Sequence, residues 1–260
     1  MSNFFGIIFS TRLFEVFMRE FFGFGGYTRE AEGYLSWQHL VFVSAFMVLM
    51  IAFAVFFGMR NRYRDEKYKN RVLIVAAIMI DLFEISKIII CCVRSQDLSY
   101  ILLDLPLFLC SIQLITIPLA AFSRGRMKEA SLDFVLIFGI LGAVLGTYFA
   151  GNNYGSYPVL SFDNTVSAIT HSISGFSSIY IAVSGMSSMK KKNGFITCAI
   201  LTVFCIAAYI ANVLIPYNYM FLMAGDGTPY DIIYNIVGGN PVIYPITVVA
   251  LFFLYILVFL

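Results

Sequence analysis

The sequence predicts an all-α membrane protein, a single bundle of seven transmembrane helices with an amphipathic interfacial helix at its N-terminus. Of the 260 residues, 60% are hydrophobic and 12% are charged, and the mean hydropathy is +0.85. A soluble domain carries roughly 25% charged residues. The apolar residues also occur in long runs of about 20, the length that crosses a bilayer as a helix. These observations favour a polytopic membrane protein over a soluble domain.

Seven segments are long and apolar enough to cross a bilayer, and we expect them at residues 36–59, 71–93, 99–122, 131–151, 163–187, 195–215 and 240–260. No tandem repeat is visible, and no linker divides the chain. We therefore expect an N-terminal interfacial segment over 1–34 and one seven-helix transmembrane domain over 35–260. In the N-terminal segment, large apolar residues recur at helical spacing with charged residues between them. This pattern is typical of an amphipathic helix lying in the membrane interface.

The charges between the spans predict the orientation. The connections at 60–71, 123–130 and 189–193 hold six, three and three basic residues. They alternate with connections in which only Arg94 is basic. Because basic loops stay on the cytoplasmic side, seven spans place the N-terminus outside and the C-terminus inside. We expect a multi-pass protein of the cell membrane.

Several classes of function are disfavoured by the residue pattern. The five cysteines lie in apolar segments without the spacing of metal ligands, so no metal and no other cofactor is predicted. The basic residues occupy short loops rather than one folded face, which argues against nucleic-acid binding. Membrane lipids are the partners that this composition indicates, and the sequence points to no protein partner.

The second predicted span carries three ionisable residues on one stripe. Asp81, Glu84 and Lys87 are spaced three residues apart, and Glu84 and Lys87 are positioned to neutralise one another. Ionisable groups inside spans often mark sites or ion paths. The alternative is a charge-paired stripe that faces the bundle and fixes packing.

The third predicted span contains the stretch "LDLPLFLCSIQ" at 103–113. Pro106 removes a helical hydrogen bond, which is tolerated where other groups or water satisfy the backbone. Cys110 and Gln113 share one helical face. Counting from Ser99 at 1.5 Å per residue, Cys110 lies roughly 16 Å deep. We expect a polar pocket here, open to the outer side.

The fifth predicted span places His171 at a similar depth, roughly 12 Å past Asp163. Ser167 and Ser174 flank His171 on the same stripe. A histidine beside a cysteine is a plausible base for a thiol nucleophile. The alternative is a packed, hydrogen-bonded histidine in a serine-rich helix contact.

Further polar residues are candidates to support this pair. His39 or Asp104 is placed to orient the histidine, as a third group does in catalytic triads. Asn218 and Tyr219 lie in a Tyr- and Asn-rich segment that is expected to cover the outer ends of the spans.

The motifs "LPLFLC" (105–110), "THS" (170–172), "NVLIPYNYMFL" (212–222) and "GGNPVIYPI" (238–246) resemble those of the YwaF-like family of bacterial integral membrane proteins. That family is related to transmembrane protein 164. The resemblance covers the chain from about residue 36 to its end. It implies acyl transfer between phospholipids, with Cys110 as the acyl-accepting nucleophile and His171 as its base.

Two functions are therefore carried forward. The first is a membrane-embedded lipid acyltransferase or lipid hydrolase that uses a Cys–His pair in the outer half of the bilayer. The second is a non-enzymatic membrane protein, either a small-molecule transporter or an accessory subunit of a membrane complex. The intramembrane charges and the lack of a soluble domain are compatible with the second function.

Overall fold

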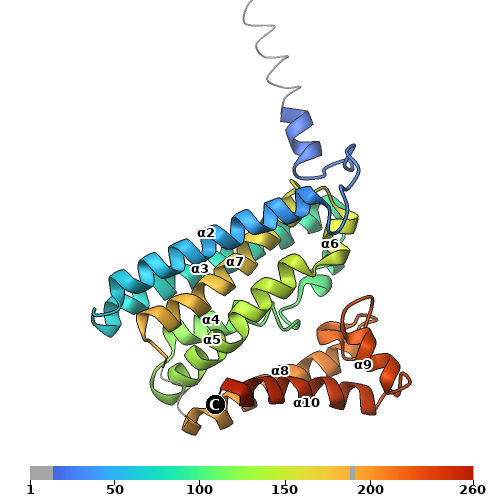
Figure 1. Cartoon of the computed structure of the whole chain (residues 1–260). Helices are drawn as coiled ribbons and strands as arrows, with labels where there is room; N and C mark the ends of the chain where they lie inside the picture. Colours follow the sequence, from blue (N-terminus) through green and yellow to red (C-terminus); the bar gives the residue numbers. More distant parts are fainter. Residues whose placement is uncertain (1–13, 188–190, 260) are drawn as a thin grey trace, which may run out of the picture.

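The computed structural model describes residues 14–187 and 191–259, and within these ranges it is helical without strands (Figure 1). Residues 14–20 are helical. The elements that follow are α2 (Trp37–Asn61), α3 (Glu66–Ser95), η1 (Leu98–Asp104), α4 (Gln113–Phe122), α5 (Gly125–Tyr148), α6 (Gly151–Ser156), α7 (Phe162–Ser184), η2 (Lys191–Asn193), α8 (Gly194–Leu214), η3 (Tyr219–Phe221), α9 (Tyr230–Ile236) and α10 (Ile243–Phe259). Short connections make successive long helices run antiparallel, as in other helix bundles.

Four stretches of the described chain form helices long and apolar enough to cross a membrane: Trp37–Asn61, Gly125–Ser156, Phe162–Ser184 and Lys191–Leu214. They correspond to four of the seven predicted spans. The other three predictions fall on α3, which is long but carries several charges, and on the shorter helices α4 and α10. The all-helical membrane class is confirmed by this architecture.

The third predicted span is not a continuous helix. Residues 98–104 form the 3-10 helix η1, residues 105–112 form an irregular turn, and α4 begins only at Gln113. The prediction of a helix through 99–122 was therefore wrong. Pro106 has no backbone N–H to donate and disfavours helical geometry in the residue before it. The depth deduced for Cys110 from a helical rise fails for the same reason.

The three basic connections meet at one end of the bundle, which we call the basic end. Lys128 forms an ion pair with Glu66 at 3.3 Å and donates a hydrogen bond to Asn70 at 3.0 Å. Arg126 donates to the carbonyl of Lys192 at 3.0 Å. These contacts join the α2–α3, α4–α5 and α7–α8 connections. The prediction that the three basic loops lie at the same end of the bundle is therefore confirmed.

Helix α7 is the centre of the bundle and packs against α2, α3 and α5 (Figure 1). Its small polar residues allow close contact with α5. Ser174 donates to the carbonyl of Gly139 at 3.1 Å, and Ser178 donates to the carbonyl of Leu136 at 2.6 Å. A methyl group at Gly139 would lie 2.7 Å from the Ser174 carbonyl oxygen, so only glycine fits there. Small residues of this kind let helix backbones approach in membranes.

Helices α8 and α10 pack on the opposite side of α5. Buried side chains of the 105–112 turn, α5, α8 and α10 form one apolar cluster. Tyr255 of α10 donates a hydrogen bond to the carbonyl of Ile137 at 3.2 Å. An open groove of about 570 Å³ runs between α8 and α10. Its walls are almost entirely apolar, and they include Cys205, Leu222 and Phe253.

The end of the bundle opposite the basic end is closed by a buried ion pair. Arg94 of α3 holds both oxygens of Asp163 of α7, at 2.6 and 2.7 Å. Tyr27 donates to the same carboxylate at 2.7 Å. The N-terminal segment is therefore anchored to the ends of α3 and α7. Residues 1–13 of the predicted interfacial helix lie outside the described residues.

Candidate functional site

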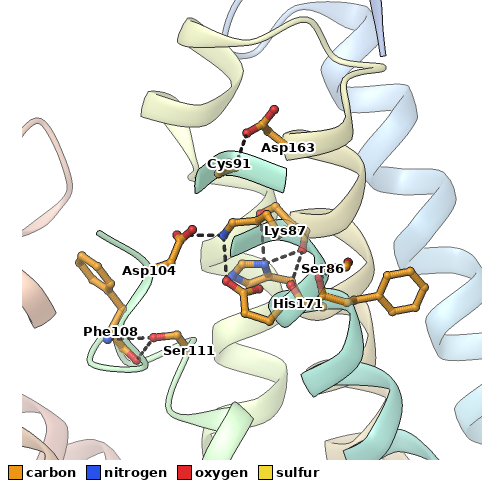
Figure 2. A network of polar contacts seen from close by, with 12 residues as sticks. Ser86, Lys87, Cys91, Asp104, Phe108, Ser111, Asp163 and His171 are labelled. Carbon is orange, nitrogen blue, oxygen red and sulfur yellow. Dashed lines mark hydrogen bonds and ion pairs between the residues drawn. The ribbon is translucent and has the colours of Figure 1, made fainter. Parts of the chain in front are cut away.

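Cys110 lies in the irregular turn that precedes α4. Ser111 closes this turn on Phe108, since the Phe108 N–H donates to the Ser111 hydroxyl at 3.0 Å (Figure 2). Cys91, Cys92 and Cys205 are buried, whereas Cys110 retains partial exposure. The break in the helix therefore presents this thiol inside the bundle without enclosing it.

His171 of α7 is an electrostatic neighbour of the Cys110 thiol. Nδ1 of His171 lies 2.7 Å from the carbonyl oxygen of Ser167, one turn earlier in α7. A carbonyl oxygen only accepts, so Nδ1 carries the ring proton in the neutral histidine. Nε2 is then the basic nitrogen, and it is available to the thiol. The backbone of α7 sets the tautomer that a base for Cys110 requires.

Two glycines of α5 make room for this pair. A methyl group at Gly142 would lie 3.3 Å from Cα of Cys110. A methyl group at Gly146 would lie 1.9 Å from both Cδ2 and Nε2 of His171. The two glycines are four residues apart and share one face of α5. Cys110 and His171 thus lie side by side against a glycine surface on α5.

A buried ion cluster adjoins the histidine (Figure 2). Lys87 pairs with Glu84 at 2.8 Å and with Asp104 at 3.0 Å, and all three side chains are at most 17% exposed. The predicted pairing of Glu84 with Lys87 is confirmed, and Asp104 joins it from η1. Asp104 therefore does not orient His171, because it binds Lys87. One oxygen of Asp104 is buried without a hydrogen-bond partner.

The predicted role of His39 beside the pair is not supported by its contacts. Its Nδ1 accepts from the N–H of Leu35 at 3.1 Å, and its Nε2 lies 3.0 Å from the carbonyl of Thr147. The ring also packs on Tyr154, with centroids 3.9 Å apart. Both nitrogens are therefore used to join the start of α2 to the end of α5.

The remaining predicted residues divide between the site and its surroundings. Ser167 contacts the histidine, with its hydroxyl 3.4 Å from Nδ1. Ser174 lies near Gly142, since a methyl group at that glycine would be 3.8 Å from the serine hydroxyl. Gln113 is fully buried, and its Oε1 accepts from Thr116 at 3.0 Å.

Asn218 and Tyr219 organise the loop near the far end of the bundle and do not contact the cysteine–histidine pair directly. Asn218 donates to the carbonyl of Ala224 at 2.8 Å and accepts from the N–H of Met223 at 2.8 Å. Tyr219 is buried, packs on Phe108 with centroids 5.6 Å apart and hydrogen-bonds the carbonyl of Leu102. The loop thereby holds the turn that carries Cys110.

A cavity of about 400 Å³ opens beside this turn. It is lined by Phe108, Asn152, Pro216, Tyr217, Asn218, Phe221 and Asp226. Its lining combines aromatic rings with polar side chains. Phe108 forms part of its wall two residues before Cys110, so the cavity reaches the turn from the far end of the bundle.

The described residues contain no group of three or more His, Cys, Asp or Glu side chains that could hold a metal ion. Gly142 and Gly146 were not among the predicted site residues, although "GAVLG" at 142–146 has the spacing of a helix-packing motif. The Arg94–Asp163 pair was not predicted either.

The chain was compared with known proteins, solved structures and protein families. No curated protein matches the chain, and no solved structure matches it. A family model does match, over residues 34–260, which is nearly the whole helical bundle. The chain therefore belongs to the TMEM164 family of membrane proteins.

Proposed function

We propose that the protein transfers acyl chains between membrane lipids, with Cys110 as the nucleophile and His171 as the base. The observation that carries this proposal is the placement of the Cys110 thiol and the His171 ring together on the Gly142–Gly146 surface. A thiol beside a basic ring nitrogen of fixed tautomer is the arrangement that thiol acyl transfer requires. Membrane lipids are the ester substrates that a site among apolar helices would meet.

The reaction proceeds in two halves. In the first, Nε2 of His171 takes the thiol proton, and the Cys110 thiolate attacks the ester carbonyl of a lipid. The carbon–oxygen bond of the ester then breaks, and His171 returns the proton to the departing oxygen. This leaves an acyl thioester on Cys110. In the second half, His171 deprotonates a lipid hydroxyl, which attacks the thioester and restores the thiol. Water in place of that hydroxyl gives hydrolysis.

The position of the pair within the bundle is compatible with access from the outer leaflet. Gly146 lies two residues before the end of α5 that faces away from the basic end. With the basic end in the cytoplasm, seven crossings put the N-terminus outside and the C-terminus inside. The pair then lies in the outer half of the membrane. The 400 Å³ cavity beside Phe108 offers the lipid ester a route to Cys110.

The apolar groove between α8 and α10 is a suitable surface for an acyl chain. Leu222, at one end of the groove, also belongs to the apolar cluster that includes Leu109 and Ile112 of the turn. A chain lying in the groove would keep its methylene groups out of water while its ester approaches the turn. About 0.8 kcal/mol is gained for each methylene that leaves water.

The test replaces each member of the pair and a matched cysteine. Purified protein in phospholipid nanodiscs is supplied with a labelled phospholipid and an unlabelled lysophospholipid, and transfer of the labelled chain is followed by mass spectrometry. Cys110→Ala and His171→Gln should abolish transfer. Cys198→Ala should leave it unchanged, because Cys198 is the other partly exposed cysteine and has no histidine beside it.

Full transfer by Cys110→Ala would refute the mechanism. Transfer that is absent from the wild-type protein and from all variants, with no thioester on Cys110, would favour the non-enzymatic role in transport or in a membrane complex. The direct sign of the proposed reaction is a mass increase of one acyl chain on the peptide containing Cys110.

A further inference from the structure

The backbone around Cys110 leaves hydrogen-bond donors without oxygen acceptors. Among the described residues, no oxygen accepts from the backbone N–H groups of Leu109, Cys110 or Ser111. More than nine in ten buried backbone groups in proteins are paired. Consecutive free N–H groups in a turn form a concave site for an anion.

The side chain of Gln113 adds a further donor. Gln113 has no exposed surface, and its amide nitrogen Nε2 is buried without a hydrogen-bond partner. The hydroxyl of Thr116 donates to Oε1 at 3.0 Å, which leaves Nε2 as the unused atom of this amide. A buried donor without an acceptor costs about 1–3 kcal/mol, so it is retained in functional sites more readily than elsewhere.

The start of α4 adds no free backbone donor. Gln113 is the first residue of this ten-residue helix, and Ile112 before it provides no side-chain cap. The N–H groups of Gln113, Leu114 and Ile115 donate to the carbonyls of Cys110, Ser111 and Ile112, so the unpaired backbone donors lie in the turn itself. Ser111 fixes the turn by accepting from the Phe108 N–H, so the donors are already in place before any ligand arrives.

We propose that this turn is an oxyanion hole, in which the backbone N–H groups of Cys110 and Ser111 and the side-chain amide of Gln113 bind the oxygen of a tetrahedral acyl intermediate. The proposal rests on the acyl-transfer function given above and deepens it. The ligand class is the negatively charged oxygen that forms on an ester carbonyl under attack by Cys110.

Negative charge passes from the Cys110 sulfur to the carbonyl oxygen during the attack. The Cys110 thiolate forms a carbon–sulfur bond to the ester carbonyl carbon, and the carbonyl π electrons pass to its oxygen. The three donors bind that oxygen while it is negative. When the intermediate collapses, the carbonyl is restored, the bond to the lipid oxygen breaks, and His171 supplies that oxygen with the proton it took from the thiol. The carbonyl oxygen gains charge as the intermediate forms, so donors placed around it lower the barrier to attack.

Two variants of Gln113 separate the donor from the shape of the residue. Gln113→Met keeps the length of the side chain and removes the amide. Gln113→Glu keeps an acceptor for Thr116 and removes the NH₂ donor. Ser172→Ala is the matched control, because the Ser172 hydroxyl is also buried without a partner, one residue after His171. Thermal unfolding of each variant shows whether it folds.

Two reactions of Cys110 are then compared in each variant. Acylation by p-nitrophenyl butyrate passes through an oxyanion, whereas alkylation by iodoacetamide displaces iodide and forms none. We expect the Gln113 variants to slow acylation by about 10²- to 10³-fold, the usual effect of removing one oxyanion donor, and to leave alkylation within a few-fold of wild type. Ser172→Ala should change neither rate.

The outcomes distinguish this proposal from the function on which it rests. Unchanged acylation in both Gln113 variants, with acylation still dependent on Cys110, would overturn the oxyanion hole and leave acyl transfer standing. Equal slowing of acylation and alkylation would also overturn it, because the amide would then act on the thiol. Acylation that survives Cys110→Ala would overturn both proposals.

Discussion

The substitution Gly146→Ala is the sharpest test of how the cysteine–histidine pair is positioned. The added methyl group would lie 1.9 Å from Cδ2 and Nε2 of His171, whereas ordinary contact begins at 3.4 Å. The ring must therefore move by about 1.5 Å, the difference between these distances. A displacement of about 1 Å at a reacting group costs on the order of 10²-fold in rate. We expect a loss of at least this size.

Two further glycines provide a graded series on the same chain. Gly142→Ala places its methyl group 3.3 Å from Cα of Cys110, so a shift of a few tenths of an ångström suffices and the rate should fall only a few-fold. Gly155→Ala meets nothing within 4 Å and should leave the rate unchanged. Overpacking at Gly146 should also lower the free energy of unfolding by about 1–3 kcal/mol.

The assay measures acyl-thioester formation on Cys110 by mass spectrometry and thermal unfolding of the same samples. If the folded Gly146→Ala protein forms the thioester at the wild-type rate, the ring of His171 is not needed where the structure places it. Equal rates for all three alanine variants would likewise contradict a role for the glycine surface in positioning His171.

Three further predictions concern charge and stability. Lys87→Met leaves the Asp104 carboxylate and its neighbour Glu84 without their cation and should cost about 3–5 kcal/mol of stability, measured by unfolding in detergent. Asp163→Asn should cost a similar amount by leaving Arg94 unpaired, and a loss below 1 kcal/mol would contradict the buried clamp. Burial and the Asp163 carboxylate raise the pKa of Tyr27. The neutral phenol therefore stabilises the folded protein up to about pH 10, near the pKa of a free tyrosine. This stabilisation is lost as the pH rises through the raised pKa of the folded protein. In an ultraviolet pH titration, the Tyr27→Phe variant should show one tyrosine fewer than the wild-type protein among those that ionise only at the highest pH.

The helical class, the positions of the long helices and the grouping of the basic loops follow from sequence because each depends on local composition. A run of about 20 apolar residues crosses the bilayer whichever face it turns to its neighbours. The break near Pro106 was also visible in the sequence. Its extent, the whole of residues 105–112, was not, because it depends on the contacts that Ser111 makes after the chain has folded.

The neighbours of a side chain depend on rotation about the helix axis, which spacing does not determine. From depth alone, His171 was predicted as the base and His39 as a residue that could orient it. Both nitrogens of His39 are used at the junction of α2 and α5, whereas the ring of His171 lies on the same glycine face of α5 as Cys110. The glycine face of α5 determines which histidine lies beside Cys110. Gly142 and Gly146 have no reactive side chain, so the pattern of reactive residues in the sequence does not include them.

The broken segment before α4 has a consequence for how the chain is assembled. At 1.5 Å per residue α4 is about 15 Å long, half the thickness of a hydrocarbon core. During synthesis this segment enters the membrane with open backbone groups, and the helices that surround it, α5 and α7, emerge from the ribosome afterwards. Hydrocarbon cannot satisfy those groups, so they must stay in contact with water or with the insertion machinery until α7 arrives. The turn that carries Cys110 is therefore enclosed only after the later helices are in place, and a chain that stops before α7 leaves its thiol exposed.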